Sequence, residues 1–162
     1  MRPNLDKIDW TELSLNHTKE AVELLKENQD KIVWYMLSAN PEAIDLLLKN
    51  QDKIVWSQIS FNHNAKDLIR NNLDKIDWSI LSSKQWAIDI LLENQDKIDW
   101  GWFSRNSSGI ELLKDNLDKV DWNPLSANYN AFEILKANSH KIDYAGLSNN
   151  QNPLIFGYYE SK

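Results

Sequence analysis

Residues 50–71 read NQDKIVWSQISFNHNAKDLIRN, and this stretch decides the fold because the rest of the chain repeats it. Its tryptophan recurs at intervals of 22 residues, at Trp34, Trp56, Trp78, Trp100 and Trp122, with Trp10 before them and Tyr144 in the next place. A fixed period of about 20–50 residues is typical of a solenoid. The sequence therefore predicts one array over residues 1–162, with copies that start near Asn4, Asn28, Asn50, Asn72, Asn94, Asn116 and Asn138.

Each copy has the pattern of two short helices. In the longer one, Asn40 is a good N-cap and Pro41 suits the first helical position. Ala43, Ile44 and Leu47 then share one face. Asn50 can end this helix in the left-handed conformation. Aspartate residues such as Asp9, Asp77, Asp99, Asp121 and Asp143 can cap the shorter helix, which carries the tryptophan. We expect an all-α fold, an α-solenoid of about seven two-helix repeats.

A leucine-rich-repeat-like solenoid is the alternative, since its period also includes 22 residues. Its strand requires an apolar residue at the position of Ser57, and no copy has a leucine there. The two end copies are irregular. The first carries two extra residues within residues 17–20, and the last looks two residues longer around residues 149–152. Irregular terminal copies are typical of caps, so we expect the first and last copies to cap the array.

Residues 37–56, LSANPEAIDLLLKNQDKIVW, resemble a tandem repeat found in many proteins of giant DNA viruses of amoebae and algae. Those arrays often close with N-P-x-I-F-x-Y, and residues 152–158, NPLIFGY, are similar to that ending. The resemblance covers nearly the whole chain and implies an interaction array like that of ankyrin, with no catalytic residue to carry over. The chain departs from the pattern at Lys84, Val33, Val55 and His140, which puts local caps in doubt.

Composition excludes several classes of protein. The chain has no cysteine, which rules out disulfides and thiolate metal sites. Its longest aliphatic run is Leu46-Leu47-Leu48, so we expect no membrane span. The N-terminus has no apolar signal core, and we expect an intracellular protein, in a host cytoplasm or a virion. The three histidines, His17, His63 and His140, fall in different copies, too far apart for a metal site or a triad. We therefore expect no enzyme and no cofactor.

An Asp-Lys pair recurs at the start of most copies, as in Asp52-Lys53, and stacking would align these pairs in rows. One interpretation is a lysine ridge that binds a polyanion. The other is an edge of ion pairs that fixes the register of the copies. The formal net charge of −6 favours ion pairs and argues against nucleic acid, because a nucleic-acid binder shows a basic footprint.

The six regularly spaced tryptophans are interpreted as core residues, whereas Trp86 and Trp102 fall outside the period. Repeat proteins keep a fixed frame and vary the binding face. We therefore expect a protein-binding surface formed by Tyr35, Met36, Phe61, Ile80, Trp86, Trp102 and Arg105. The alternative is that Trp86 and Trp102 only cover each other. The function that follows is a non-catalytic scaffold for protein–protein interaction. The other two hypotheses are a structural component that self-assembles through its terminal copies and a polyanion binder.

Overall fold

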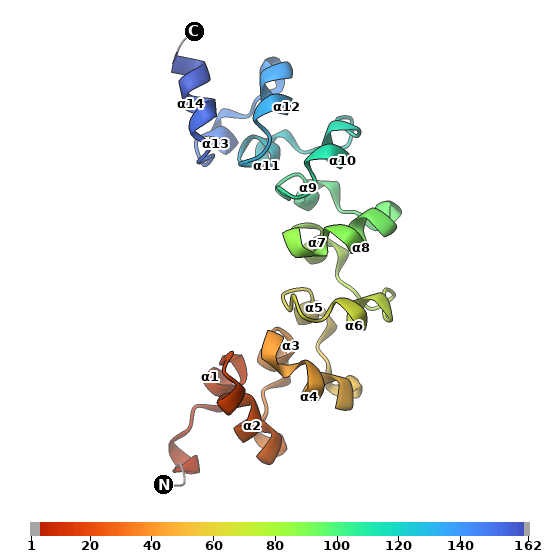
Figure 1. Ribbon diagram of the computed structural model, residues 1–162, viewed down its shortest axis with the longest axis vertical. Coiled ribbons are helices and arrows are strands. Elements are labelled where there is room, and N and C mark those ends of the chain that lie inside the picture. The colour runs from red at the N-terminus through yellow and green to blue at the C-terminus, as the bar shows by residue number, and fades with distance from the viewer. Residues whose placement is uncertain (1–3, 161–162) are drawn as a thin grey trace. The chain divides into compact units, whose positions relative to one another are not determined.

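The computed structural model describes residues 4–160, except the side chains of residues 156 and 158–160. Helices make up its regular structure, and residues 4–160 contain no strand. This confirms the all-α repeat, and the leucine-rich alternative is wrong. Contacts divide the chain into two compact units, Met1–Asp77 and Trp78–Lys162. In Figure 1 the first unit runs from red to yellow-green, and the second runs from green to blue.

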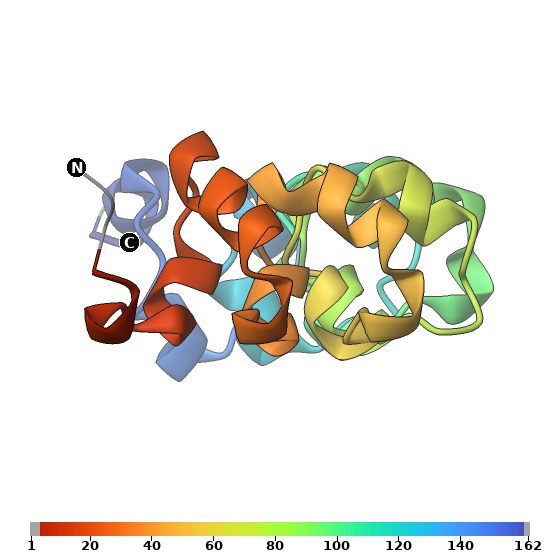
Figure 2. The ribbon, with the colours of Figure 1, turned by 90° about the horizontal axis from the view of Figure 1, so that it is seen from below.

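The first unit contains three copies, each built from two short helices. The helices that start at the repeated tryptophan are α1 (Trp10–Leu15), α3 (Trp34–Ser38) and α5 (Trp56–Ile59). The second helices are α2 (Lys19–Glu27), α4 (Ile44–Lys49) and α6 (Lys66–Arg70). Helix α3 packs between α1 and α5, so the copies stack in sequence order. Figure 2 shows these short helices, coloured red to yellow, and the loops that join them.

The second unit repeats this plan in four copies. The helices at the tryptophan or tyrosine position are α7 (Trp78–Ser82), α9 (Trp100–Phe103), α11 (Trp122–Ser126) and α13 (Tyr144–Leu147). The second helices are α8 (Ile88–Glu93), α10 (Ile110–Lys114), α12 (Phe132–Ala137) and α14 (Pro153–Glu160). Helix α7 packs on α9, and α11 packs on α13. Short 3-10 turns join many of the helices, at Leu5–Lys7, Gln29–Lys31, Pro41–Ala43, Gln51–Lys53, Gln85–Ala87, Gln95–Lys97 and Ser139–Lys141.

Side-chain caps define where many helices begin. Asp9, Asp99, Asp121 and Asp143 each accept a hydrogen bond from a backbone N–H in the first turn of the helix that follows, as expected. Asn40 accepts from the N–H of Glu42 at 3.0 Å, and Pro41 opens the 3-10 turn. In both end copies a second cap follows the first. Asn16 and Thr18 act in series before α2, and Asn150 and Asn152 do so before α14.

Asn50, which ends the second helix of its copy, does not adopt the left-handed conformation predicted for it. Asn50 has φ −135° and ψ 51°, and no residue among 4–160 adopts the left-handed conformation. Instead, the side-chain amide of Asn50 donates to the carbonyl of Leu46, four residues earlier, at 2.9 Å. The same bond forms at Asn28, Asn72, Asn94, Asn116 and Asn138. The amide therefore satisfies a carbonyl that the end of the helix leaves open.

Within each unit, a row of buried asparagines joins successive copies. Asn62 is fully buried, and its Nδ2 donates to the carbonyls of Asn40 at 2.7 Å and Ser38 at 3.3 Å. Asn40, Asn106 and Asn150 make the same two bonds to their own preceding copies, and Asn128 donates to the carbonyl of Ser104. Buried polar groups of loops need such partners. These bonds fix the register between copies, and Lys84 is the one residue that replaces the asparagine.

A second row consists of buried serines. Ser38 Oγ donates to the carbonyl of Trp34 at 2.7 Å and accepts from the N–H of Val55, in the next copy, at 2.9 Å. Ser14 and Ser104 make the same two bonds. Ser60 Oγ is the exception, because this buried oxygen has no hydrogen-bond partner among residues 4–160. The apolar core lies between the two helices of each copy and is fully buried at Leu37, Leu47, Ile59 and Ile69 in the first unit.

Candidate interaction surface

The repeated tryptophans are not core residues, which corrects the sequence interpretation. Trp34, Trp56, Trp100 and Trp122 are half-buried, and a lysine of the next copy lies over each ring. The ammonium nitrogen is 4.8–5.0 Å from the ring centroid in the pairs Lys53–Trp34, Lys75–Trp56, Lys119–Trp100 and Lys141–Trp122. A cation at this distance is attracted to the ring face. The lysine row therefore covers the tryptophan row, a role that the sequence analysis missed.

Trp102 faces outward because Phe103, the next residue of its helix, occupies the core. In α9, Phe103 is fully buried and meets Trp100 edge to face, with ring centroids 5.6 Å apart. Trp102 lies between them in sequence, on another face of the helix, and is 49% exposed. The Oδ1 atom of Asp99 accepts from the N–H of Trp102 at 3.1 Å and fixes the first turn. The exposed indole thus stands on a capped and well-packed helix.

Trp102 and Arg105 lie together in a shallow hollow of about 290 Å³ in the second unit. The guanidinium carbon of Arg105 is 5.6 Å from the centroid of the Trp102 ring. Both residues belong to the predicted binding surface. The other lining residues are Asp99, Gly101, Asp121, Asn123 and Pro124. Three of these belong to the next copy, and the sequence analysis did not assign them to the surface.

Two carboxylates and one guanidinium give the hollow a negative balance. Both oxygens of Asp99 are engaged, with the N–H of Trp102 and with the hydroxyl of Ser79 at 3.0 Å. Asp121 is exposed, and its Oδ1 accepts from the N–H of Asn123 at 3.0 Å. Within residues 4–160, no hydrogen bond is formed by the second carboxylate oxygen of Asp121. The hollow therefore offers a ring face and a carboxylate to a cationic or apolar group.

Trp86 takes no part in this hollow. It lies half-buried in the 3-10 turn Gln85–Ala87, and no ring contact joins it to Trp102 among the residues that the structure describes. Ile80 is half-buried in α7, at the position in its copy that Trp102 holds in the next.

Tyr35, Met36 and Phe61 belong to the first unit. Tyr35 and Phe61 are 51% and 46% exposed, and Met36 is half-buried. Tyr35 and Met36 lie on α3, and Phe61 follows the C-cap of α5, which packs on α3. The structure thus gathers two of the seven predicted residues into one hollow and leaves three others on the other unit.

Metal-ligand clusters and membrane-spanning helices were both searched for in residues 4–160. No three His, Asp or Glu side chains there are grouped so that they could hold a metal ion. None of the helices in that range is long and apolar enough to cross a membrane.

Comparison with known proteins does not assign the chain to a class. No protein-family model matches it, and no curated protein or solved structure is significantly similar to it.

Proposed function

We propose that this protein is a non-catalytic repeat scaffold that binds a segment of another protein in the hollow around Trp102. One observation carries the proposal: the large Trp102 ring is 49% exposed although its helix is capped and the adjacent Phe103 is fully buried. Exposed tryptophan and arginine are typical anchors of protein interfaces. The frame that holds them repeats, whereas the residues at their positions change from copy to copy.

The hollow favours a segment with a basic side chain. An arginine or lysine of the partner can lay its aliphatic stem on the indole and its charge beside Asp121. The formal net charge of −6 would attract such a segment from a distance. The polyanion hypothesis is less well supported, because the lysines that would form its ridge lie over tryptophan rings and beside aspartates, such as Lys97 at 3.6 Å from Asp96.

We propose an intracellular setting for this scaffold. The resemblance to the giant-virus repeats belongs to the same proposal, and the shared Asn-Pro and Asp-Lys-Ile motifs support it. Neither statement is needed for the binding test.

An array of short peptides of varied charge, probed with the full chain, tests the proposal. We expect retention of peptides that contain Arg or Lys, and a loss of affinity of about tenfold or more in Trp102→Ser, with little change in Tm. Tyr129→Ser is the matched control, because Tyr129 is an exposed aromatic residue outside the hollow. Equal binding by Trp102→Ser and the unmodified chain, or a preference for acidic peptides, would overturn the proposal.

A further inference from the structure

The two end copies expose positions that the interior copies bury. Asn40, Asn62, Asn106, Asn128 and Asn150 are at most 3% exposed, whereas Asn16 at the same position is exposed. Leu37, Ile59, Leu81, Phe103 and Leu125 are fully buried, whereas Leu13 is only half-buried. The first copy therefore has the side of a repeat interface on which a preceding copy would stack.

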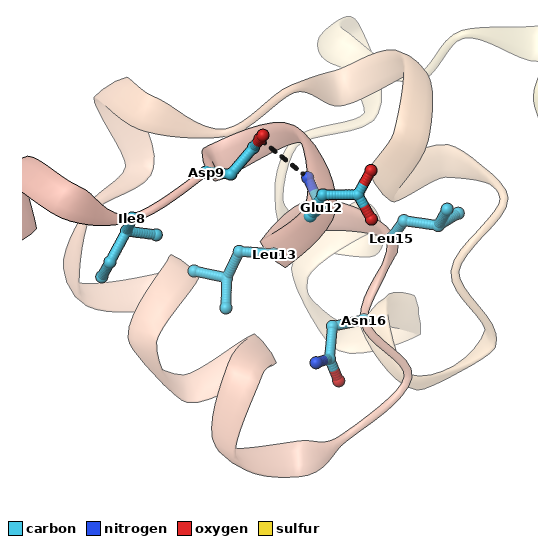
Figure 3. Close-up of a pocket in the computed structure, with 6 residues that line it drawn as sticks. All are labelled: Ile8, Asp9, Glu12, Leu13, Leu15 and Asn16. Carbon is cyan, nitrogen blue, oxygen red and sulfur yellow. Dashed lines mark hydrogen bonds between the residues drawn. The ribbon is translucent and has the colours of Figure 1, made fainter.

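This N-terminal edge forms a hollow of about 420 Å³ lined by Ile8, Asp9, Glu12, Leu13, Leu15 and Asn16. Figure 3 shows these residues around α1, with the bond from the N–H of Glu12 to Asp9. Asn16 Oδ1 accepts from the N–H of Thr18 at 2.9 Å, as in the interior copies. Within residues 4–160, the Nδ2 atom of Asn16 lacks the carbonyls that its counterparts contact. It is a donor whose partners would belong to a preceding copy.

The last copy has the opposite side of the same interface. Ser14, Ser38, Ser60, Ser82, Ser104 and Ser126 are fully buried, whereas Ser148 is exposed. Tyr144 is 68% exposed, although the tryptophans at its position are half-buried. In the interior copies this side offers a serine hydroxyl and two carbonyls to the next copy.

We propose that a second copy of this chain docks head to tail, with its Ser148 edge on the Asn16 edge of the first. The interior bonds specify the pairing. Asn16 Nδ2 would donate to the carbonyls of Ser148 and Asn150, as Asn62 does to those of Ser38 and Asn40. The N–H of Asp9 would donate to Ser148 Oγ, as that of Val55 does to Ser38.

Apolar and cationic side chains of the two edges would also pair as they do between interior copies. Lys7 would lie over the Tyr144 ring, as Lys53 lies over Trp34. Ile8 and Leu13 would be covered as their interior counterparts are. The inference departs from the expectation that the end copies close the array. Because the two edges differ, the contact is heterologous and leaves one free edge at each end, so association continues beyond a dimer.

Two single substitutions test this pairing by blocking one edge each. Ile8→Arg blocks the N-terminal edge, and Ser148→Arg blocks the other; both positions are at least partly exposed, so circular dichroism should show native folding. By sedimentation velocity from micromolar to millimolar concentration, we expect the unmodified chain to associate beyond a dimer. Each variant alone should stay monomeric, and an equimolar mixture should stop at a dimer.

The control is Leu92→Arg, which places the same charge on an exposed leucine of an interior copy and should associate like the unmodified chain. A monomeric unmodified chain at the highest concentration would overturn the proposal. So would a mixture of the two blocked variants that stays monomeric while the unmodified chain associates, or an unmodified chain that stops at a dimer. The Trp102 hollow takes no part in these edges, so failure here leaves the peptide-binding proposal intact.

Discussion

The ammonium nitrogen of Lys53 lies 5.0 Å from the centroid of the Trp34 ring, and the two residues belong to successive copies. Lys53 is exposed and Trp34 is half-buried, so the contact lies on the outer edge of the interface between copies. The lysine–tryptophan contact gives the recurring Asp-Lys and tryptophan motifs a shared structural role. It joins successive copies at the surface, whereas the buried asparagines join them in the interior.

A double-mutant cycle with Lys53→Met and Trp34→Leu measures this contact. We expect a coupling free energy of about 0.5–1 kcal/mol in urea unfolding, because cation–π pairs at exposed sites have that strength. The control cycle combines Lys53→Met with Trp56→Leu, whose ring is covered by Lys75 instead. Its coupling should be near zero. Equal coupling in the two cycles would show that the lysine does not act through the Trp34 ring.

Removing the hydroxyl should have opposite effects at two equivalent serines. Ser38→Ala deletes two hydrogen bonds and leaves the part-buried N–H of Val55 without its acceptor, so we expect a loss of about 1–3 kcal/mol in unfolding free energy. Ser60→Ala removes a buried hydroxyl that has no partner in the part of the chain that the structure describes, and it should be neutral or slightly stabilising. Chemical denaturation of both variants checks the difference. Equal losses at the two sites would contradict it.

Gly109 and Phe103 form a size-matched pair in the second unit. Five other copies have alanine at the glycine position, and a Cβ added to Gly109 would clash with the end of the Phe103 ring. We expect Gly109→Ala to lower the unfolding free energy by about 1–3 kcal/mol through overpacking. Adding Phe103→Leu should recover most of the loss, since leucine occupies that position in other copies. Thermal unfolding of the two single variants and the double variant tests this prediction. If the losses of unfolding free energy are additive, the two residues are not paired.

Lys84 replaces the asparagine cap of its copy. It is the N-cap of Gln85–Ala87 and makes no side-chain cap, whereas Asn40 accepts from the N–H of Glu42. We expect Lys84→Asn to raise the unfolding free energy by about 1 kcal/mol near neutral pH, because an asparagine would accept from the N–H of Trp86. Lys49→Asn, at an exposed lysine of α4, is the control and should not stabilise. A Lys84→Asn variant with a lower unfolding free energy than the unmodified chain would contradict the cap assignment.

The same variant has a predicted pH dependence. Partial burial lowers the pKa of Lys84 from its ordinary value of 10.5, so folding disfavours its charged form. In the alkaline range below 10.5, the unfolded chain binds more protons at this residue than the folded chain, and stability rises with pH. The advantage of Lys84→Asn over the unmodified chain should therefore shrink as pH approaches 10.5. Urea unfolding at neutral and alkaline pH measures this; an advantage that grows with pH would contradict it.

The sequence predicts features that depend on one copy alone. The period, the two helices and the aspartate caps follow from residues such as Asp9 and Asn40, whose partners lie two or three positions ahead. The helix ends were predicted incorrectly because the side-chain amide of Asn50 reaches back to Leu46, which makes a left-handed residue unnecessary. A left-handed residue and a side-chain amide can each satisfy the last carbonyls of a helix, and an asparagine in the sequence is compatible with both.

Features shared between copies were harder to predict. Trp34 was assigned to the core because its position holds an aromatic residue in every copy, but the lysine that covers it lies in the next copy. Trp102 and Arg105 stood out because they break the pattern, and they do share a hollow. Asp121 and Asn123 were missed, since their place beside Trp102 depends on how the next copy packs.

The direction of the asparagine bonds has a consequence for biosynthesis. From Asn40 to Asn150, each buried amide donates to carbonyls at least 22 residues earlier in the chain, and never to later ones. As the chain leaves the ribosome, the acceptors of each asparagine have therefore already been made. Within each unit, a new copy can dock on a finished template without waiting for downstream sequence. Such an array can grow vectorially from its N-terminus, one copy at a time.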